Sequence, residues 1–430
     1  MRKIYTYNIT SIDKLIYNLL FLSKKQTHIS LLLSNHNELE CKLPMYYMNY
    51  DAICGIGKKK GIKVDADSLL ELRNFHNRYN DWMFGYLSYD LKNEIEDLGS
   101  YNNDKLASNN LSFFIPKYVL LLKKGILEVL THESKEDVDL LLKDHNNLVV
   151  TKKNKVNLTP QETKEEYINK IIKIKRHIQD GDIYEMNYCL NYFSDNVDLD
   201  PETIFKKLND LSRNPFSAFM KIDEQCVISS SPERYLKKIN NKLISQPIKG
   251  SIKRGRDNKE DSYYLNKLKF NKKDIIENVM VVDLVRNDLS KTADQKTVNV
   301  DELCKVYSFH NIHQMISTIS SRTSDKTHFT DILESTFPMG SMTGVPKIKA
   351  MDLIDKYEEF RRGIFSGSIG YITPEGDFDF NVVIRTILYN SCNKYLSVSA
   401  GGAITIKSDP EEEYEECKLK MKPIVDILNN

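Results

Sequence analysis

The chain has 430 residues, with 61 basic and 60 acidic side chains and a formal net charge of +1. Hydrophobic residues make up 41% and charged residues 28%, which is typical of a soluble globular protein. This balance gives no argument for a nucleic-acid or membrane surface. The seven cysteines are odd in number and form no C-x-x-C pair, so we expect a cytoplasmic protein without disulfides or a zinc site.

The first part of the chain contains one apolar run and several strand-like segments. Residues 15–22 are apolar but interrupted by Asn18, and they predict a core helix rather than a signal peptide or membrane span. Strand-like runs follow at residues 28–33, 82–89 and 117–122. The glycine- and lysine-rich segment 55–61 is interpreted as an exposed basic turn, since it lacks the phosphate-loop pattern.

A polar, proline-marked connection at residues 159–164 favours a boundary near residue 155. We therefore expect an N-terminal domain at residues 1–155 and a catalytic domain at residues 156–430. Helical periodicity predicts helices at residues 166–179, 274–289 and 348–359, with a last helix starting near Glu411. Strands are expected at residues 226–230, 241–248, 365–373, 378–389 and 395–406. This order predicts an α+β fold in which antiparallel β-sheets pack as a sandwich with helices on the outside.

Two of the predicted helices carry carboxylates. The helix at residues 274–289 has a strongly apolar centre, which predicts burial around much of its girth. The charges in this helix indicate either a structural ion pair, such as Asp283 with Arg286, or a carboxylate aimed into a site, and for Glu277 the sequence favours neither. In the last helix, Glu412, Glu416 and Lys420 are spaced four apart and share one face, which on its own indicates a solvated face.

Glycine-rich turns offer backbone amides that can bind an anion, although such turns can also serve only to reverse the chain. Residues 337–347 form one such segment, and Gly401-Gly402 form another. His310 and His313 lack the spacing of a zinc helix motif, and we interpret them as structural or substrate-contacting side chains.

Eight segments occur together in an order that resembles the chorismate-utilising enzymes, a family with anthranilate synthase component I, aminodeoxychorismate synthase component I, and isochorismate and salicylate synthases. The segments are residues 181–184, 231–234, 247–250, 282–288, 337–347, 362–371, 384–386 and 413–416. The resemblance covers residues 165–425 and implies the anthranilate synthase component I-like fold. Residues before 155 match more weakly, mainly at residues 82–90.

The resemblance also implies a substrate and a cofactor. Chorismate carries two carboxylates, and in this family Mg²⁺ holds the ring carboxylate through positions that match Glu277 and Glu416. Arg385, Gly401 and Gly402 match positions that hold the second carboxylate, and an arginine fork suits that group. The remaining positions expected to contact substrate are Lys420, Ser341, Thr343, Gly250 and Ser251.

Glu233 and Lys249 match the two reactive positions of the family. Glu233 corresponds to the general acid that protonates the departing C4 hydroxyl, so burial should raise its pKa; the alternative is an ion pair with Arg234. Lys249 corresponds to a nucleophile that attacks C2 and is then displaced when ammonia enters at C4. Such a lysine must be neutral, so we expect a lowered pKa; the alternative is a solvated loop lysine.

Lys249 distinguishes the members of the family. Anthranilate synthases usually carry alanine here, whereas aminodeoxychorismate synthases carry lysine, so we expect component I of an aminodeoxychorismate synthase. Its ammonia would come from a separate glutamine amidotransferase subunit, because no glutaminase motif is present. The alternatives are anthranilate synthase component I and a non-catalytic chorismate-binding relative.

Four positions depart from the family pattern. Glu185 stands where aminating members mostly carry glutamine and water-adding members carry lysine, and its role is open. Gln314 stands where the family usually has histidine, and Ala403 replaces a customary glycine. Phe365 replaces a tyrosine or other aromatic residue. These departures affect the details of substrate contact more than the reaction class.

Overall fold

The computed structural model describes residues 2–35, 49–143 and 155–429. The strands of this part of the chain are β1 (Lys3–Asn8), β2 (His28–Leu33), β3 (Ala52–Val64), β4 (Met83–Leu87), β5 (Leu111–Lys123), β6 (Ile126–Thr131), β7 (Thr159–Pro160), β8 (Glu185–Ser194), β9 (Phe216–Ile222), β10 (Gln225–Ser231), β11 (Arg234–Ile239), β12 (Lys242–Gln246), β13 (Ile248–Lys253), β14 (Asn299–Ser308), β15 (Ile312–Arg322), β16 (Gly344–Val345), β17 (Ser368–Ile372), β18 (Phe378–Asn381), β19 (Thr386–Asn390) and β20 (Tyr395–Ile404).

The helices are α1 (Ile12–Ser23), α2 (Ser68–Tyr79), α3 (Lys92–Ile95), α4 (Lys135–Leu142), α5 (Lys164–Gln179), α6 (Pro201–Ser212), α7 (Asn258–Lys269), α8 (Lys272–Ser290), α9 (Phe329–Thr336), α10 (Lys347–Tyr357) and α11 (Pro410–Asn429), with short 3₁₀ turns η2 (Tyr89–Leu91) and η3 (Gly340–Met342). None of the helices in the described ranges is both long and apolar enough to cross a membrane.

The strands form one connected antiparallel network. Strand β2 pairs with β3 on one side and with β9 on the other, and β4 pairs with β5 and β17. Strands from before and after residue 155 are therefore hydrogen-bonded neighbours. The division of the chain into domains at residues 1–155 and 156–430 stays a prediction.

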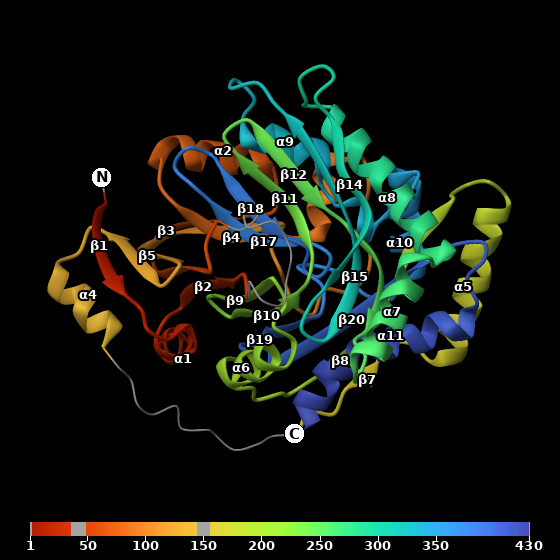
Figure 1. Ribbon diagram of the computed structural model, residues 1–430, viewed down its shortest axis with the longest axis horizontal. Helices are drawn as coiled ribbons and strands as arrows, with labels where there is room; N and C mark the ends of the chain where they lie inside the picture. Colours follow the sequence, from red (N-terminus) through yellow and green to blue (C-terminus); the bar gives the residue numbers. More distant parts are fainter. Residues whose placement is uncertain (1, 36–48, 144–154, 430) are drawn as a thin grey trace.

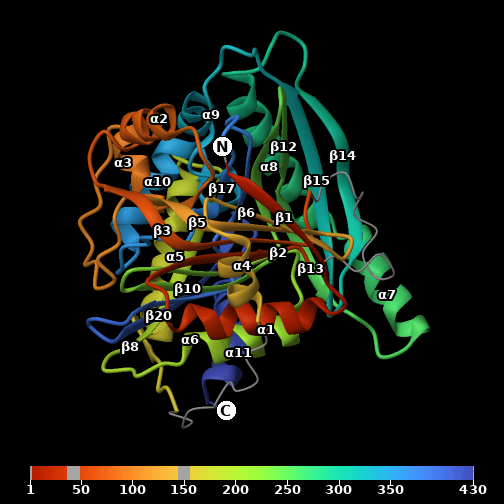
Figure 2. The ribbon, with the colours of Figure 1, turned by 90° about the vertical axis from the view of Figure 1, so that its left-hand side faces the viewer.

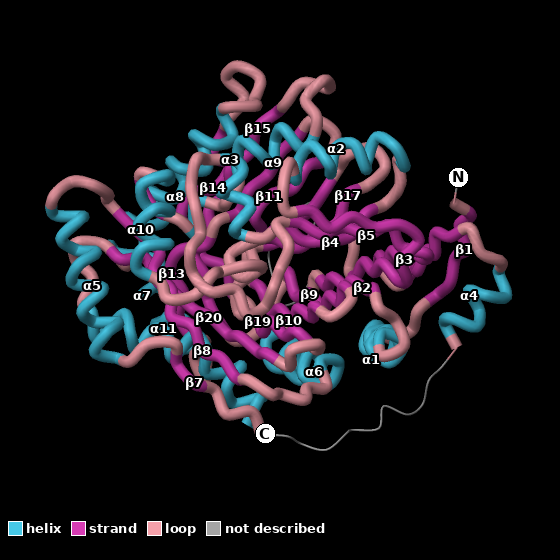
Figure 3. Tube along the Cα trace, turned by 180° about the vertical axis from the view of Figure 1, so that it is seen from behind, coloured by secondary structure: helices cyan, strands magenta, loops and turns pink. Residues whose placement is uncertain are grey.

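Alternate residues of the central strands face two separate hydrophobic cores, because successive side chains of a strand point to opposite faces. In β5, Val119 and Leu121 belong to one core, while Leu120 and Leu122 belong to the other. The second core also takes its side chains from α1, α5, α6, α10 and α11. Figure 3 shows the helices around the outside of the strands. The predicted α+β class with antiparallel strands and outer helices is confirmed.

Local sequence explains where the helices begin and which face they bury. Helix α5 starts at a capping box in which Thr163 and Glu166 satisfy each other's backbone amides. Its buried residues Tyr167, Ile171 and Ile174 lie three or four apart, which places them on one face. Figure 1 shows α5, α7, α8 and α11 gathered on one side of the molecule, and Figure 2 shows α1 along the opposite, outer side of the sheet.

Two local predictions were wrong. Residues 55–61 form no turn, because β3 pairs with β5 along its whole length, with a register shift between Lys58 and Lys60. The glycines and lysines there mark a bulge and an exposed end of the strand rather than a chain reversal. The predicted strand at residues 378–389 is divided into β18 and β19, and Arg385 between them has a φ of +54°.

Candidate active site

Lys249 lies among three buried glutamates that come from distant parts of the chain. Its Nζ is 3.1 Å from Oε1 of Glu185, the first residue of β8. Glu233 and Glu277 are the other two carboxylates whose charge acts on it. The exposed fractions of Glu185, Glu233 and Glu277 are 2%, 4% and 7%. We call these four residues the Lys249 cluster.

The backbone around Lys249 is irregular in a way that fixes its direction. The register between β13 and β15 shifts at this point, and Gly250 has a φ of +90°. A Cβ at Gly250 would lie 2.8 Å from the Cβ of Asp274, so only glycine fits. The Asn278 amide of α8 donates to the Lys249 carbonyl at 3.4 Å. Because bulges re-aim side chains, this arrangement orients Lys249.

The charge state of Lys249 differs from our expectation. Burial alone would lower the pKa of Lys249, but the charges of Glu185, Glu277 and Glu233 outweigh burial and raise that pKa. The expected lowering of the pKa is therefore wrong for the substrate-free protein. The reason is the surrounding carboxylates, which stabilise the ammonium form.

Glu233 lies in the short connection between β10 and β11. Burial raises the pKa of Glu233 to about 7, against the opposing effects of the Ser341 hydroxyl and the Lys249 ammonium. This agrees with the raised pKa expected for a proton donor. Arg234, the suggested partner of Glu233, instead forms a two-pronged ion pair with Asp379 at 2.9 and 3.1 Å.

Glu277 lies on the one buried face of α8. Asn271 caps the start of this helix, and Asn278 and Val281 share the buried face, whereas Val279 is exposed. The helix is therefore not buried around its girth as predicted. Glu277 Oε1 has no hydrogen-bond partner within the described part of the chain. Burial raises the pKa of Glu277 to about 7, although the Lys249 and Lys273 ammonium groups oppose it.

A second group of charges on α11 faces α8 and β20. Lys420 Nζ lies 2.7 Å from Glu416 Oε1 and donates to the Gly401 carbonyl at 2.8 Å. The Lys420 ammonium lowers the pKa of the half-exposed Glu416. Glu413 is buried and accepts from Lys273 Nζ at 2.9 Å.

Lys273 links this group to the Lys249 cluster. Its Nζ lies 4.0 Å from Glu277 Oε1, and burial would lower its pKa, but Glu413, Glu277 and Glu416 together raise it. The face shared by Glu416 and Lys420 is thus engaged with neighbouring elements rather than simply solvated.

Arg385 and Gly402 lie beside the α11 group. Arg385 donates from Nη1 to the Lys420 carbonyl at 2.8 Å. Burial lowers the pKa of Arg385, and Glu416 opposes this. A Cβ at Gly402 would lie 2.9 Å from Glu413 Oε2, so the missing side chain lets this carboxylate approach the strand. Lys420 therefore contacts both Arg385, through its carbonyl, and Gly401, through its ammonium group.

The glycine-rich segment 337–347 forms η3 and β16, and its backbone is hydrogen-bonded to Arg362. Arg362, buried and paired with Glu358 at 2.6 Å, donates from Nη1 to the Met342 carbonyl at 2.7 Å. Ser341 and Thr343 are buried; Thr343 donates to the Gly340 carbonyl at 3.3 Å. The Ser341 hydroxyl is close enough to lower the pKa of Glu233, yet it makes no hydrogen bond of good geometry to any described residue.

The strand β15 carries the histidine region. His313 is buried between Ser308 at 2.9 Å and Asp261 at 3.0 Å, which is a structural role. Ser251 pairs in register with Gln314 but is exposed. The side-chain amide oxygen Oε1 of Gln314 is buried and has no hydrogen-bond partner among the described residues.

The carboxylates of Glu277 and Glu416 are of the ligand type that a magnesium ion prefers. Glu277 and Glu416 offer only oxygen atoms, and the buried Glu277 Oε1, which has no hydrogen-bond partner among the described residues, would be stabilised by a cation. No group of three or more His, Cys, Asp or Glu residues suited to a metal occurs in the described ranges. Mg²⁺ commonly uses one or two protein carboxylates and takes the rest of its ligands from substrate and water.

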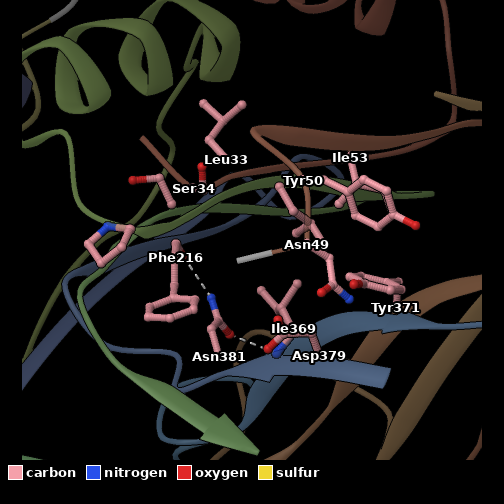
Figure 4. Close-up of a pocket in the computed structure, with 13 residues that line it drawn as sticks. Leu33, Ser34, Asn49, Tyr50, Ile53, Phe216, Ile369, Tyr371, Asp379 and Asn381 are labelled. Atoms are coloured by element: carbon pink, nitrogen blue, oxygen red, sulfur yellow. Dashed lines mark hydrogen bonds between the residues drawn. The ribbon is translucent and has the colours of Figure 1, made fainter. Parts of the chain in front are cut away.

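A separate pocket is lined by residues of β2, β9, β17 and β18 and of the segments next to them (Figure 4). Its walls include Leu33, Phe216 and Tyr371, and Asn381 donates to the Phe216 carbonyl at 3.1 Å. It shares no residue with the Lys249 cluster.

Four residues of this region were not among the predicted site residues. Glu185 was noted only as a departure, and Lys273, Asn278 and Glu413 were not identified. The i,i+4 spacing of Lys273 and Glu277 and the i,i+3 spacing of Glu413 and Glu416 are signals that could have found two of them.

Comparison with known proteins gives one family over most of the chain. The family described as chorismate binding enzyme matches residues 37–426. The chain is 37% identical over 266 residues to aminodeoxychorismate synthase component 1 of Escherichia coli K12, covering 62% of this chain and 58% of that protein. It is 31% identical over 381 residues to anthranilate synthase component 1 of Acetivibrio thermocellus, covering 82% and 76%.

The match spans only part of some relatives, including 30% of the chloroplastic aminodeoxychorismate synthase of Arabidopsis thaliana, to which the chain is 36% identical over 64% of its own length. Two solved structures share the fold. Anthranilate synthase component I of Streptococcus pneumoniae TIGR4 superposes with a TM-score of 0.76 at 22% identity, covering 87% of this chain and 91% of that chain. The isochorismate synthase MenF of Escherichia coli gives a TM-score of 0.77 at 16% identity, covering 100% and 95%.

Proposed function

Because the chain belongs to the chorismate-binding enzyme family, we propose that it aminates chorismate at C4, as component I of an aminodeoxychorismate synthase. The product would be 4-amino-4-deoxychorismate, a precursor for p-aminobenzoate and folate. The observation that carries this proposal is the largely covered side chain of Lys249, which is 11% exposed and lies 3.1 Å from the buried carboxylate of Glu185. A solvated loop lysine would not have so little of its side chain exposed beside the buried carboxylate of Glu185.

In the proposed reaction Lys249 and Glu233 act at two different ring carbons of chorismate, C2 and C4. Lys249 Nζ attacks C2, and the C4 hydroxyl departs with the proton that Glu233 holds. A carboxyl whose pKa is about 7 retains that proton in a substantial fraction of molecules near neutral pH. Ammonia then enters at C4 and expels Lys249.

The remaining residues bind and orient the substrate. Arg385 and Lys420 would receive its second carboxylate, with Gly401 and Gly402 leaving room on β20. Ser341 and Thr343 would line the site, and Gly250 would hold the direction of Lys249 with Ser251 beside it. Glu277 and Glu416 would hold Mg²⁺, which supplies positive charge to the ring carboxylate when bound.

The ammonia source would be a glutamine amidotransferase subunit, as expected for a component I. Anthranilate synthase component I is the second candidate function, favoured by the 31% identity over 381 residues to such an enzyme. The two functions differ in their product and in the need for Lys249.

The test is the product formed from chorismate, Mg²⁺ and an ammonium salt, identified by mass and fluorescence. We expect aminodeoxychorismate, with loss of about 10³-fold or more in rate for Lys249→Ala, as for removal of a nucleophile. Lys253→Ala, an exposed lysine on the same strand, is the matched control. Anthranilate as the sole product, or full turnover by Lys249→Ala, would refute the proposal.

A further inference from the structure

We propose that Glu185 is the base that takes the proton from the Lys249 ammonium group, so that the lysine becomes a nucleophile only inside the assembled site. This inference rests on the proposed function and adds a residue to it. Glu185 touches the reacting nitrogen directly, with Oε1 3.1 Å from Lys249 Nζ.

The ion pair is shielded from water on both sides. The side chains of Lys249 and Glu185 are 11% and 3% exposed. Glu185 Oε2 is buried and accepts no hydrogen bond from any described residue. Removing two opposite charges from water costs free energy. Transfer of one proton from Lys249 to Glu185 would convert the pair into two neutral groups. The carboxylate is thus placed to accept the proton when an anionic substrate displaces the remaining water.

Glu185 is held in place by its backbone. Strand β16 pairs with the start of β8, Val345 opposite Glu185, and the Tyr184 amide donates to the Val345 carbonyl at 2.6 Å. A Cβ at Gly344 would lie 2.2 Å from the Glu185 carbonyl oxygen, so only glycine permits this approach. The glycine-rich segment therefore fixes the carboxylate that faces Lys249, rather than serving as a chain reversal alone.

The other carboxylates around Lys249 are less suited to this step. Glu233 must keep its own proton to release the C4 hydroxyl. Glu277 is assigned to Mg²⁺, and no contact within 4.0 Å between it and Lys249 is found among the described ion pairs. Glu416 pairs with Lys420 at 2.7 Å. Glu185 is the carboxylate in direct contact with the nitrogen.

The proton and bond changes balance over one turnover. Glu185 takes a proton from Lys249, the bond from Nζ to C2 forms, the bond from C4 to oxygen breaks, and the hydroxyl leaves as water with the Glu233 proton. Ammonia then bonds to C4 and the bond from C2 to Nζ breaks. The new C4 ammonium group gives one proton to the Glu233 carboxylate. Glu185 gives the proton that it took from Lys249 back to the lysine.

The test compares Glu185→Gln with wild type at each pH, because the ratio of their rates cancels the pH dependence of ammonia itself. Glutamine keeps an oxygen that can accept from Lys249 but cannot take its proton. We expect a loss of about 10²-fold near pH 7. The ratio of variant to wild-type rate should rise about tenfold per pH unit, since Lys249 must then lose its proton to solvent. A ratio that does not change with pH would overturn the inference.

A second variant and a second readout cover a failure to fold or bind. Glu185→Asp keeps the carboxylate, so its ratio to wild type should be independent of pH, even if its rate is low. The pH midpoint for modification of Lys249 by an amine-reactive reagent, followed by peptide mass, should fall in Glu185→Gln; equal midpoints would contradict the ion pair. Glu334→Gln, an exposed glutamate of α9, is the control. If wild type forms no aminodeoxychorismate, the proposed function fails; if only the ratio is flat, this inference alone fails.

Discussion

Replacing Glu233 by glutamine should make the protein more stable and less active at the same time. The buried carboxyl has an ordinary pKa of 4.5 that rises to about 7 in the folded protein. The folded state therefore binds a proton that the unfolded chain has already lost, and stability falls as pH rises from about 4.5 to about 7. Above that window both states are ionised and the loss is complete.

The magnitude follows from the two pKa values. Each pH unit between them is worth ~1.4 kcal/mol, so ionising Glu233 costs the folded protein about 3 kcal/mol. Glutamine resembles the protonated carboxyl in size and has no charge to bury. Glu233→Gln should therefore exceed the free energy of unfolding of wild type by less than about 1 kcal/mol at pH 5 and by about 3 kcal/mol at pH 8.

The assay is urea denaturation of both proteins at pH 5 and pH 8, together with aminodeoxychorismate formation. Loss of the proton donor should lower the rate by about 10²-fold or more. Glu334→Gln serves again as the exposed control, with no pH-dependent difference expected. A stability difference that stays constant between the two pH values would refute the claim that Glu233 is buried and neutral.

Three further predictions concern a residue proposed to hold Mg²⁺ and two residues that position the backbone around the site. Glu277→Gln should raise the Mg²⁺ concentration for half-maximal activity by about tenfold or more, because a charged oxygen ligand is lost, whereas the exposed Glu412→Gln should not; a titration of activity against Mg²⁺ decides this. Gly250→Ala should lower stability by about 1–3 kcal/mol, from strain at positive φ plus the contact with Asp274, as measured by thermal unfolding. Gly181→Ala, with a φ of +84° and open space around the added Cβ, should cost less, so equal losses would deny the contact. Arg362→Lys should lower the unfolding free energy by about 3 kcal/mol, because lysine cannot keep all the bonds of the buried guanidinium, and an unchanged urea midpoint would contradict this.

Periodicity in the sequence was sufficient for elements whose burial is set by their own pattern. Helix α5 and strand β2 lie within two residues of the predicted ranges 166–179 and 28–33. The pattern failed where the structure of a segment depends on a partner that is distant in the sequence. Residues 55–61 of β3 look like a turn by composition, but β5 pairs with eleven of the thirteen residues of β3. The long β14–β15 hairpin was not predicted, since exposed polar residues dominate β14.

The same distinction applies to the site. The residue types at 233, 249, 277 and 416 could be chosen from ordered motifs, but the charge state of Lys249 could not. That state depends on Glu185, which is 64 positions earlier in the chain and meets Lys249 only after β8 and β13 have been placed. A pKa reflects the three-dimensional surroundings of a group, and sequence spacing does not contain them.

The pairing of β4 with β17 has a consequence for synthesis of the chain. Strand β4 leaves the ribosome early, but its second neighbour, residues 368–372, follows roughly 280 residues later, which is on the order of tens of seconds at ~5–20 residues per second. During that delay one edge of a fully apolar strand has no partner in the nascent chain. We expect newly made protein to depend on chaperones over this interval, and aggregation during expression to be sensitive to the rate of translation.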